Sequence, residues 1–331
     1  MSEPVVSFIV PFRNAQEHIP RLLECFAAHA RRESWELLLI NDASTDHGHM
    51  VAERAFAKLG LPARLLDGAG EGPGSARNLG IEHARGQYIV FCDVDDLLEV
   101  EKIFQLCGEM ERVGAELAVF NHQRLYPSGR LKLNSQTDLL NSLPPLVADL
   151  ADRVQLLKNF NVCWNKIYRR TLLDKYGLRF PEGIYEDVPW SIVVLALASS
   201  ILVTDKIIYT YRQHHASILR KKGVEHLSIV EQYRRALSVL AFNRVDEFFL
   251  KEVRLRAVKH VFLVGYSRSR LGLDLRGRLF RDLLLFVSEQ KVAREIVFDR
   301  RLMVEQRLSL LLSNRWPLEL SRIVRWFLGR G

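Results

Sequence analysis

The chain has 331 residues with 48% apolar and 26% charged side chains, an ordinary globular composition that is long enough for about two domains. Its net charge of +8 is unevenly distributed, with 14 Lys/Arg against 21 Asp/Glu in residues 1–150 and 33 against 18 in residues 151–331. A basic half can meet nucleic acid, an anionic membrane face or an anionic substrate, and charge alone does not choose among them.

Cysteine usage and hydropathy indicate the compartment. The four cysteines are widely spaced, form no CxxC pair and fall in apolar stretches, so we expect buried free thiols in a reducing environment. The N-terminal stretch MSEPVVSFIV lacks a basic segment ahead of a long apolar core and does not resemble a signal peptide. The longest apolar run, 188–203, contains Pro189 and is shorter than the ~20 residues of a spanning helix. We therefore expect a buried helix that leads into a strand.

Strand and helix patterns alternate through the first hundred residues. Apolar β-branched runs predict strands, and apolar spacing of three to four predicts helices. The predicted order is strand 5–12, helix 18–30, strand 35–42, helix 49–60, strand 63–68, helix 75–85 and strand 86–93. This alternation predicts an α/β fold with a doubly wound, mostly parallel sheet and right-handed crossovers.

Polar clusters follow four of the predicted strands. They read PFRN, NDASTD, GEGPGSARN and CDVDD. Ligands of such sheets bind outside the carboxyl ends of the strands, so four loops converge on one edge.

Each cluster also has a structural interpretation. Asp42, Ser44 and Asp46 can form a turn and cap the next helix. The glycine-rich stretch 68–74 can be a flexible loop, because no GxGxxG or GxxxxGK[ST] spacing is present. For Asp93, Asp95 and Asp96 we favour a function, since like charges at the end of a buried strand are costly unless a cation neutralises them.

The order of six segments resembles the family-2 glycosyltransferases of bacterial surface polysaccharide synthesis, which have the GT-A fold. The segments are VSFIVPFRNAQEHI, LLLINDASTD, GPGSARNLGIEHARGQYIVFCDVDD, CWNKIYRRTLL, LRFPEGIYEDVPW and YRQHHASI, and the resemblance covers residues 5–220. It implies a nucleotide-sugar donor, a glycan or glycolipid acceptor and a divalent Mn²⁺ or Mg²⁺.

The metal follows from the chemistry of the donor as well. Departure of a diphosphate builds negative charge, which a hard cation held by one or two carboxylates can neutralise. The resemblance places the DxD motif of the family on Asp93, Val94 and Asp95. It implies that Asp95 contacts the metal and that Asp93 contacts the ribose or the sugar.

Other donor-binding positions carry over one at a time. Pro11 and Phe12 match the segment that borders the nucleoside, and Asp42 matches the acid that accepts a hydrogen bond from uracil. Arg77 matches a residue near the donor, although a helix-face ion pair explains it equally well. The chain departs from the family at Arg13 and Gln16, where tyrosine and glutamate are common.

The catalytic base is expected in the segment IYEDVPW. The resemblance implies that Asp187 accepts the proton of the acceptor hydroxyl and that Glu186 orients the acceptor. Two acids at a helix N-terminus are also favourable without any catalytic role. His214 matches a histidine that contacts the metal or the diphosphate, with a structural histidine as the alternative.

Beyond residue 224 the spacing becomes helical, with arginine and lysine interleaved with apolar residues. This basic amphipathic pattern suits an anionic membrane surface, and packing on the catalytic domain explains it too. We expect a GT-A catalytic domain at 1–223, with a nucleotide-sugar half at 1–100 and an acceptor half at 101–223. A basic helical region follows at 224–331. For the tail from Arg315 we favour the membrane.

The resemblance, together with these patterns, implies an inverting, metal-dependent hexosyltransferase that transfers a sugar from a UDP-linked donor to a lipopolysaccharide, capsule or similar glycan. It would be cytoplasmic and peripheral at the inner membrane face. The alternatives are a sugar-phosphate nucleotidyltransferase and a nonenzymatic, receiver-like scaffold. The first would need a glycine-rich signature after the first strand, which VPFRNAQEH lacks. Nucleic-acid binding has no supporting motif.

Overall fold

The computed structural model describes residues 5–29, 34–159, 161–213, 222–290, 299 and 301–302. It divides the chain into two compact units, Met1–His214 and His215–Gly331. The expectations for His214 and for the tail from Arg315 lie outside the described residues. No helix in the described part of the chain is long and apolar enough to cross a membrane.

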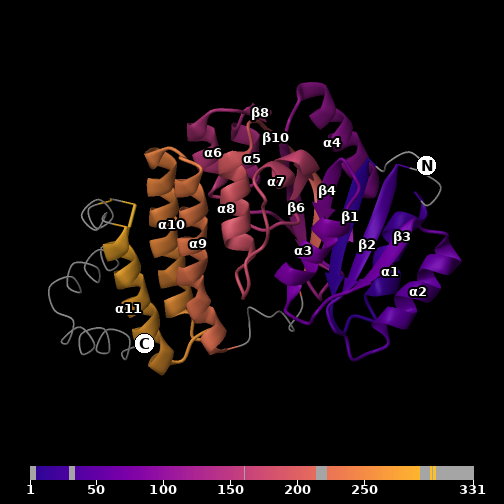
Figure 1. The fold of residues 1–331 in the computed structure, drawn as a ribbon, viewed down its shortest axis with the longest axis horizontal. Helices are drawn as coiled ribbons and strands as arrows, with labels where there is room; N and C mark the ends of the chain where they lie inside the picture. Colours follow the sequence, from indigo (N-terminus) through magenta and orange to yellow (C-terminus); the bar gives the residue numbers. More distant parts are fainter. Residues whose placement is uncertain are drawn as a thin grey trace. The chain divides into compact units, whose positions relative to one another are not determined.

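The first unit is built around a mixed sheet (Figure 1). Its strands are β1 (Val6–Phe12), β2 (Trp35–Asn41), β3 (Ala63–Asp67), β4 (Tyr88–Phe91), β5 (Leu97–Leu98), β6 (Leu117–Leu125), β7 (Leu131–Leu133), β8 (Leu146–Val147), β9 (Lys166–Arg169) and β10 (Ile201–Arg212). Its helices are α1 (Ile19–Ala27), α2 (Gly48–Leu59), α3 (Pro73–His83), α4 (Val100–Val113), α5 (Thr137–Ser142), α6 (Leu150–Leu156), α7 (Arg170–Lys175) and α8 (Asp187–Leu197).

The sheet order is β3-β2-β1-β4-β9-β6-β10-β5, with β7 paired to β6 and β8 paired to β10. Neighbours are parallel from β3 through β4 and between β6 and β10. The pairs that involve β5, β7, β8 and β9 are antiparallel. The predicted doubly wound, mostly parallel sheet is therefore confirmed, with β9 inserted antiparallel between its two parallel parts.

The first strands are buried on both faces, as expected when helices cover a parallel sheet on both sides. All seven residues of β1 are buried. Phe8 of β1 meets Phe26 of α1 and Trp35 of β2 edge-on, with ring centroids 5.0 and 6.1 Å apart. Such aromatic pairs contribute ~0.5–1.5 kcal/mol each beyond the burial of their area. This core packs α1 against β1 and β2.

Two further expectations concern the apolar run and the thiols. The run 188–203 forms the buried helix α8 and the start of β10, as predicted. All four cysteines are free, with Cys92, Cys107 and Cys163 buried and Cys25 half-buried.

The second unit is helical in the part that the structure describes. A short 3₁₀ helix, η2 (Val224–Leu227), leads into α9 (Ser228–Phe242), α10 (Glu247–Tyr266) and α11 (Leu273–Glu289). These three helices pack against one another (Figure 1). Asp246 caps α10 by accepting a hydrogen bond from the Phe248 N–H at 2.8 Å, a common way of satisfying a free N–H at a helix start. The predicted helical region beyond residue 224 is thus confirmed through Glu289.

Candidate active site

Asp42 follows β2, and its carboxylate holds the loop after β3. Its Oδ1 atom accepts the Gly70 N–H at 2.9 Å, and its Oδ2 atom accepts the Gly72 N–H at 3.0 Å. Both glycines have positive φ values, 80° and 102°, which L-residues with side chains rarely adopt. The glycines are therefore required by this loop conformation. A uracil ring could still use the remaining lone pairs of the carboxylate, since each oxygen has two.

The end of β1 borders the same loops. Pro11 and Phe12 are buried, and the Phe12 carbonyl oxygen accepts the Asp42 N–H at 2.8 Å. The next turn contains Asn14, whose φ is 51°. Its Oδ1 atom accepts both the N–H and the hydroxyl of Thr45, at 2.7 and 3.2 Å. The loops after β1 and β2 are therefore joined at the edge where a nucleoside is expected.

The two positions that depart from the family pattern also make loop contacts. The N–H of Gln16 donates to Asp46 at 2.9 Å, and its side-chain oxygen accepts the His47 N–H at 3.0 Å. The Arg13 guanidinium donates to the Gly70 carbonyl oxygen at 3.4 Å. Both side chains thus take part in holding the loops together.

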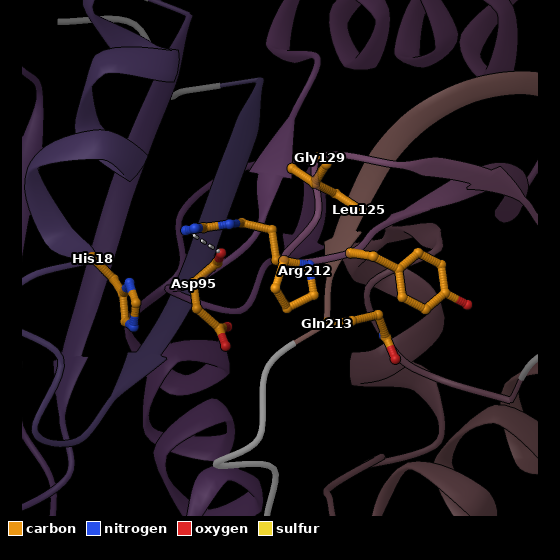
Figure 2. A pocket seen from close by; sticks show the side chains of 8 residues that line it. His18, Asp95, Leu125, Gly129, Arg212 and Gln213 are labelled. Atoms are coloured by element: carbon orange, nitrogen blue, oxygen red, sulfur yellow. Dashed lines mark hydrogen bonds between the residues drawn. The ribbon is translucent and has the colours of Figure 1, made fainter.

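The three acids after β4 have three different surroundings. Asp96 is 1% exposed and accepts the Tyr209 hydroxyl and the Arg212 N–H, both at 2.7 Å. The same Tyr209 oxygen accepts the Asp93 N–H at 3.0 Å. Asp95 is half-buried and lines a cavity (Figure 2). Asp96 therefore anchors the loop to β10, and this leaves Asp93 and Asp95 as the candidate ligand-binding acids.

Arg77 joins Asp93 to the two candidate catalytic acids. Its Nη2 atom lies 2.8 Å from Asp93 Oδ1, and its Nη1 atom lies 2.9 Å from Glu186 Oε1 and 3.5 Å from Asp187 Oδ1. The arginine is only 4% exposed, so all three interactions form largely away from water. These partners do not lie on the helix of Arg77, so the contacts form a buried network between segments and not the helix-face ion pair offered as the alternative to donor binding.

The sequence around Arg77 explains how it reaches these acids. Asn78 donates to the Phe180 carbonyl oxygen at 2.9 Å and accepts the Phe180 N–H at 2.8 Å, which clamps the two segments together. A Cβ atom on Gly74 would lie 3.2 Å from the Glu186 Cγ atom, so only glycine allows this approach without displacement. The sequence did not predict these roles of Asn78 and Gly74, although both residues lie in the segment GPGSARN.

Burial changes the proton affinity of two of these acids. Burial raises the pKa of Glu186 to about 7; repulsion from Asp187 adds to this and Arg77 opposes it. Burial also raises the pKa of Asp93 to about 6, against the attraction of Arg77. Desolvation therefore exceeds the effect of the one guanidinium. Carboxyl groups with pKa values near neutrality are common at functional sites.

The segment before α8 is strained, and its aromatic residues belong to the core. Tyr185 has a φ of 65°, unusual for a bulky residue and often found beside functional groups. Trp164, Tyr185 and Trp190 are between 2% and 6% exposed. Trp190 stacks on Phe180 with ring centroids 3.9 Å apart. These three aromatic residues are therefore part of the core.

The side chains near Asp95 fit a metal ion that is coordinated partly by the protein and partly by the phosphates of a bound substrate. The described residues contain no group of three or more His, Cys, Asp or Glu that could hold a metal ion alone. Asp95 contributes one half-buried carboxylate, and Val94 beside it is also half-buried. Mg²⁺ sites commonly use one or two carboxylates together with substrate phosphates. Asp95 is suited to such a site.

The sequence of this chain matches one family model and is similar to proteins of known family. The model of the family described as "Glycosyl transferase family 2" matches residues 7–177. The "Succinoglycan biosynthesis protein ExoO" of Rhizobium meliloti is 29% identical over 283 residues, which are 82% of this chain and 76% of that protein.

Two solved structures are similar in fold. TarS 1–349 of Staphylococcus aureus, crystallised with UDP-GlcNAc, superposes with a TM-score of 0.76 at 21% identity, and the match covers 98% of this chain and 92% of that one. The mannosyltransferase PcManGT of Pyrobaculum calidifontis, in complex with GDP-Man and Mn²⁺, gives a TM-score of 0.52 at 16% identity. That match covers 99% of this chain and 84% of the other.

Proposed function

The chain belongs to glycosyl transferase family 2, and we propose that it is an inverting, metal-dependent enzyme that moves a hexosyl group from a UDP-linked sugar to a hydroxyl of a bacterial cell-surface glycan. The glycan would be lipopolysaccharide, capsule or exopolysaccharide. The observation that carries the proposal is the Arg77 network, because it holds the donor-side Asp93 next to Glu186 and Asp187. Family membership sets aside the receiver-like scaffold and the sugar-phosphate nucleotidyltransferase.

In the proposed reaction Asp187 accepts the proton of the acceptor hydroxyl. That oxygen forms a bond to the anomeric carbon of the donor sugar, while the bond from this carbon to the phosphate oxygen breaks on the opposite face. The nucleoside diphosphate leaves with the electron pair. Attack opposite the leaving group inverts the anomeric configuration, and a single positioned base is sufficient for this.

Glu186 and Arg77 prepare the base for this step. Arg77 holds both acids through one nitrogen, at 2.9 Å for Glu186 and 3.5 Å for Asp187. With a pKa of about 7, Glu186 can carry a proton at neutral pH and so orient the acceptor as a hydrogen-bond donor. A protonated Glu186 also leaves more of the positive charge of Arg77 for Asp93 and Asp187.

Donor binding is assigned to the loops after β1 to β4. Pro11, Phe12 and Asp42 would border the nucleoside, and Asp93 would contact the ribose or the sugar. Asp95, and His214 outside the described residues, would hold Mn²⁺ or Mg²⁺. When bound, the metal supplies charge neutralisation for the departing diphosphate. The solved neighbours with UDP-GlcNAc, and with GDP-Man and Mn²⁺, support this assignment by their fold.

A donor-hydrolysis assay tests the proposal without knowledge of the acceptor. We expect a panel of nucleotide sugars to show hydrolysis of one donor that depends on Mn²⁺. Asp95→Ala should abolish the metal-dependent part, and Glu82→Gln, an exposed change on α3, should retain it. Failure to bind or hydrolyse any nucleotide sugar would contradict the proposed function.

The location is part of the same proposal. The acceptor half, 101–223, would meet a lipid-linked glycan at the inner face of the cytoplasmic membrane, with the basic region 224–331 attracted to anionic lipid. Support comes from the charge of residues 151–331, which hold 33 Lys/Arg against 18 Asp/Glu, because basic residues near such a surface contribute on the order of 1 kcal/mol each. Salt-sensitive binding to anionic liposomes that is lost after deletion of 315–331 is the expected result. A full-length chain that ignores these liposomes at low salt would contradict it.

A further inference from the structure

A cavity of about 330 Å³ lies beside Asp95 in the first unit (Figure 2). Its walls come from four segments: the start of α1 at His18, the loop after β4 at Asp95, the β6–β7 hairpin at Tyr126 and Pro127, and the end of β10. This volume is at the lower end of the range for small-molecule sites, about 300–1,000 Å³. One monosaccharide unit is therefore a suitable occupant by size.

The end of β10 gives the cavity polar groups with capacity for a ligand. Among the described residues, the side chain of Arg212 makes one hydrogen bond, to the Asp95 carbonyl oxygen at 3.4 Å. The amide nitrogen of Gln213, which also lines the cavity, is buried, and the Gln213 side chain interacts with the Tyr211 hydroxyl. Arg212 and Gln213 thus place N–H donors at the wall of the cavity, where a bound hydroxyl or anion can accept from them.

The hairpin adds an aromatic ring and positive charge. The Arg130 guanidinium lies 4.8 Å from the centroid of the half-buried Tyr126 ring, which supports the ring from one side. Residues 117–137 contain Arg124, Arg130 and Lys132 and no acidic residue. Asp95 is the one carboxylate among the described residues that line the cavity, and in the proposed function it holds the metal. A negatively charged ligand is thus favoured over a neutral one.

Most of the cavity wall lies away from the strand ends assigned to the nucleoside, with His18 before α1 on the nearer side. The nucleoside is assigned to the ends of β1, β2 and β3, and the DxD motif follows β4. In the sheet order β6 and β10 lie beyond β4, on the side away from β3. A ligand at the ends of β6 and β10 therefore lies past the diphosphate, where the acceptor approaches.

We propose that this cavity binds a sugar unit of the acceptor that carries a carboxylate or phosphate group, with its ring on Tyr126 and its anionic group on Arg212. The inference rests on the proposed function, because it assumes transfer to a glycan. It makes the acceptor an anionic glycan and assigns its recognition to the β6–β7 hairpin and the end of β10.

Saturation-transfer NMR with the full-length chain tests the proposal without turnover. The probes are glucuronate, glucose 6-phosphate, neutral methyl glucoside and inorganic phosphate, at constant ionic strength. We expect binding of an anionic sugar, either uronate or sugar phosphate, with weaker binding of the glucoside and of free phosphate. A response as strong for the neutral glucoside, or for phosphate alone, would overturn the proposal.

Substitutions at the cavity wall test whether the anionic sugar binds there. Arg212→Gln should weaken binding of the anionic sugar by roughly tenfold or more, the worth of a hydrogen bond to a charged group. Tyr126→Ala should reduce it and Tyr126→Phe should retain it, because the ring is kept. Tyr176→Ala is the matched control, since Tyr176 is half-buried and the Lys175 ammonium lies 4.8 Å from its ring centroid.

Two outcomes separate this inference from the proposed function. If UDP displaces the sugar probe, or Tyr126→Ala loses UDP affinity, the cavity belongs to the donor and the inference is wrong. If the chain binds UDP and hydrolyses a nucleotide sugar while anionic sugars bind equally to wild type, Arg212→Gln and Tyr126→Ala, the inference fails and the proposed function stands.

Discussion

Arg77 donates to Asp93 at 2.8 Å across the boundary between helix α3 and the loop after β4. The same guanidinium contacts Glu186 at 2.9 Å. One buried cation thus compensates acids from the donor side and from the start of α8. In the proposed function, movement of Asp93 on donor binding would change the charge that Arg77 presents to Glu186 and Asp187.

The first prediction concerns this cation. Arg77→Met should lower the free energy of unfolding by about 3–5 kcal/mol, because it leaves buried acids without their partner. Arg77→Lys should cost less and still impair the site, since one ammonium cannot reproduce the planar fork that contacts Asp93 and Glu186 together. Urea unfolding measures both. Arg54→Met, at an exposed position of α2, is the control and should stay within ~0.5 kcal/mol of wild type. A similarly small effect of Arg77→Met would show that the network is not stabilising.

The second prediction is a pH dependence of stability. Burial raises the pKa of Glu186 from 4.5 to about 7, so the folded state binds this proton more tightly than the unfolded state. Between these two values the unfolded chain holds fewer protons, and the contribution of Glu186 to stability therefore falls as pH rises. Glu186→Gln should flatten the decline between pH 4.5 and 7 in urea unfolding. The exposed Glu82→Gln should keep the wild-type slope; equal slopes in all three proteins would disprove the shift.

Local sequence patterns were sufficient for most of the fold. The predicted strands and helices of residues 5–93 correspond to β1 through β4 and α1 through α3, because their apolar spacing matches their burial on both faces of the sheet. The antiparallel insertion of β9 between β4 and β6 was not predicted. It depends on pairing between Tyr88 and Arg169, residues far apart in the chain, and such pairing leaves no local signal.

The sequence predicted which residues belong to the candidate site, but it predicted fewer of the contacts between them. The acids Asp93, Asp95, Glu186 and Asp187 were chosen from motifs, and their roles remain proposals. The contact of Arg77 with acids of two segments could not be derived, because it depends on how α3 meets the segment before α8. The separate structural role of Asp96 was also hidden, since its partner Tyr209 lies 113 positions away.

A third prediction tests the metal assignment. Asp95→Ala should abolish the difference in UDP affinity measured with and without Mn²⁺, because it removes the carboxylate assigned to the metal. The free energy of unfolding should not fall, since the change also removes a charge that repels Asp93. Calorimetric titration with UDP measures the affinity. A metal effect that survives in Asp95→Ala would move the metal to other ligands.

A fourth prediction tests the nucleoside loop. Asp42→Ala leaves the N–H groups of Gly70 and Gly72 without their acceptor, at a cost of about 1–3 kcal/mol for each one that stays buried. We expect a looser loop and a clear loss of UDP affinity. Asp42→Asn keeps one acceptor oxygen and should lose less. If Asp42→Ala binds UDP like wild type, neither the carboxylate nor the loop contributes to the nucleoside site.

The last prediction separates the base from its neighbour. Asp187→Asn keeps the shape of the side chain and removes its ability to accept a proton at neutral pH. Transfer should fall by roughly 10²–10⁴-fold, the usual contribution of a general base, while UDP affinity persists because Asp93 and Asp95 are unchanged. Glu186→Gln should reduce transfer less, because Glu186 is assigned to orientation and not to proton removal. The rates are compared under donor saturation, so that they report the transfer step. Near-normal transfer by Asp187→Asn together with inactive Glu186→Gln would reassign the base to Glu186, whose pKa of about 7 would then be that of the group that removes the proton.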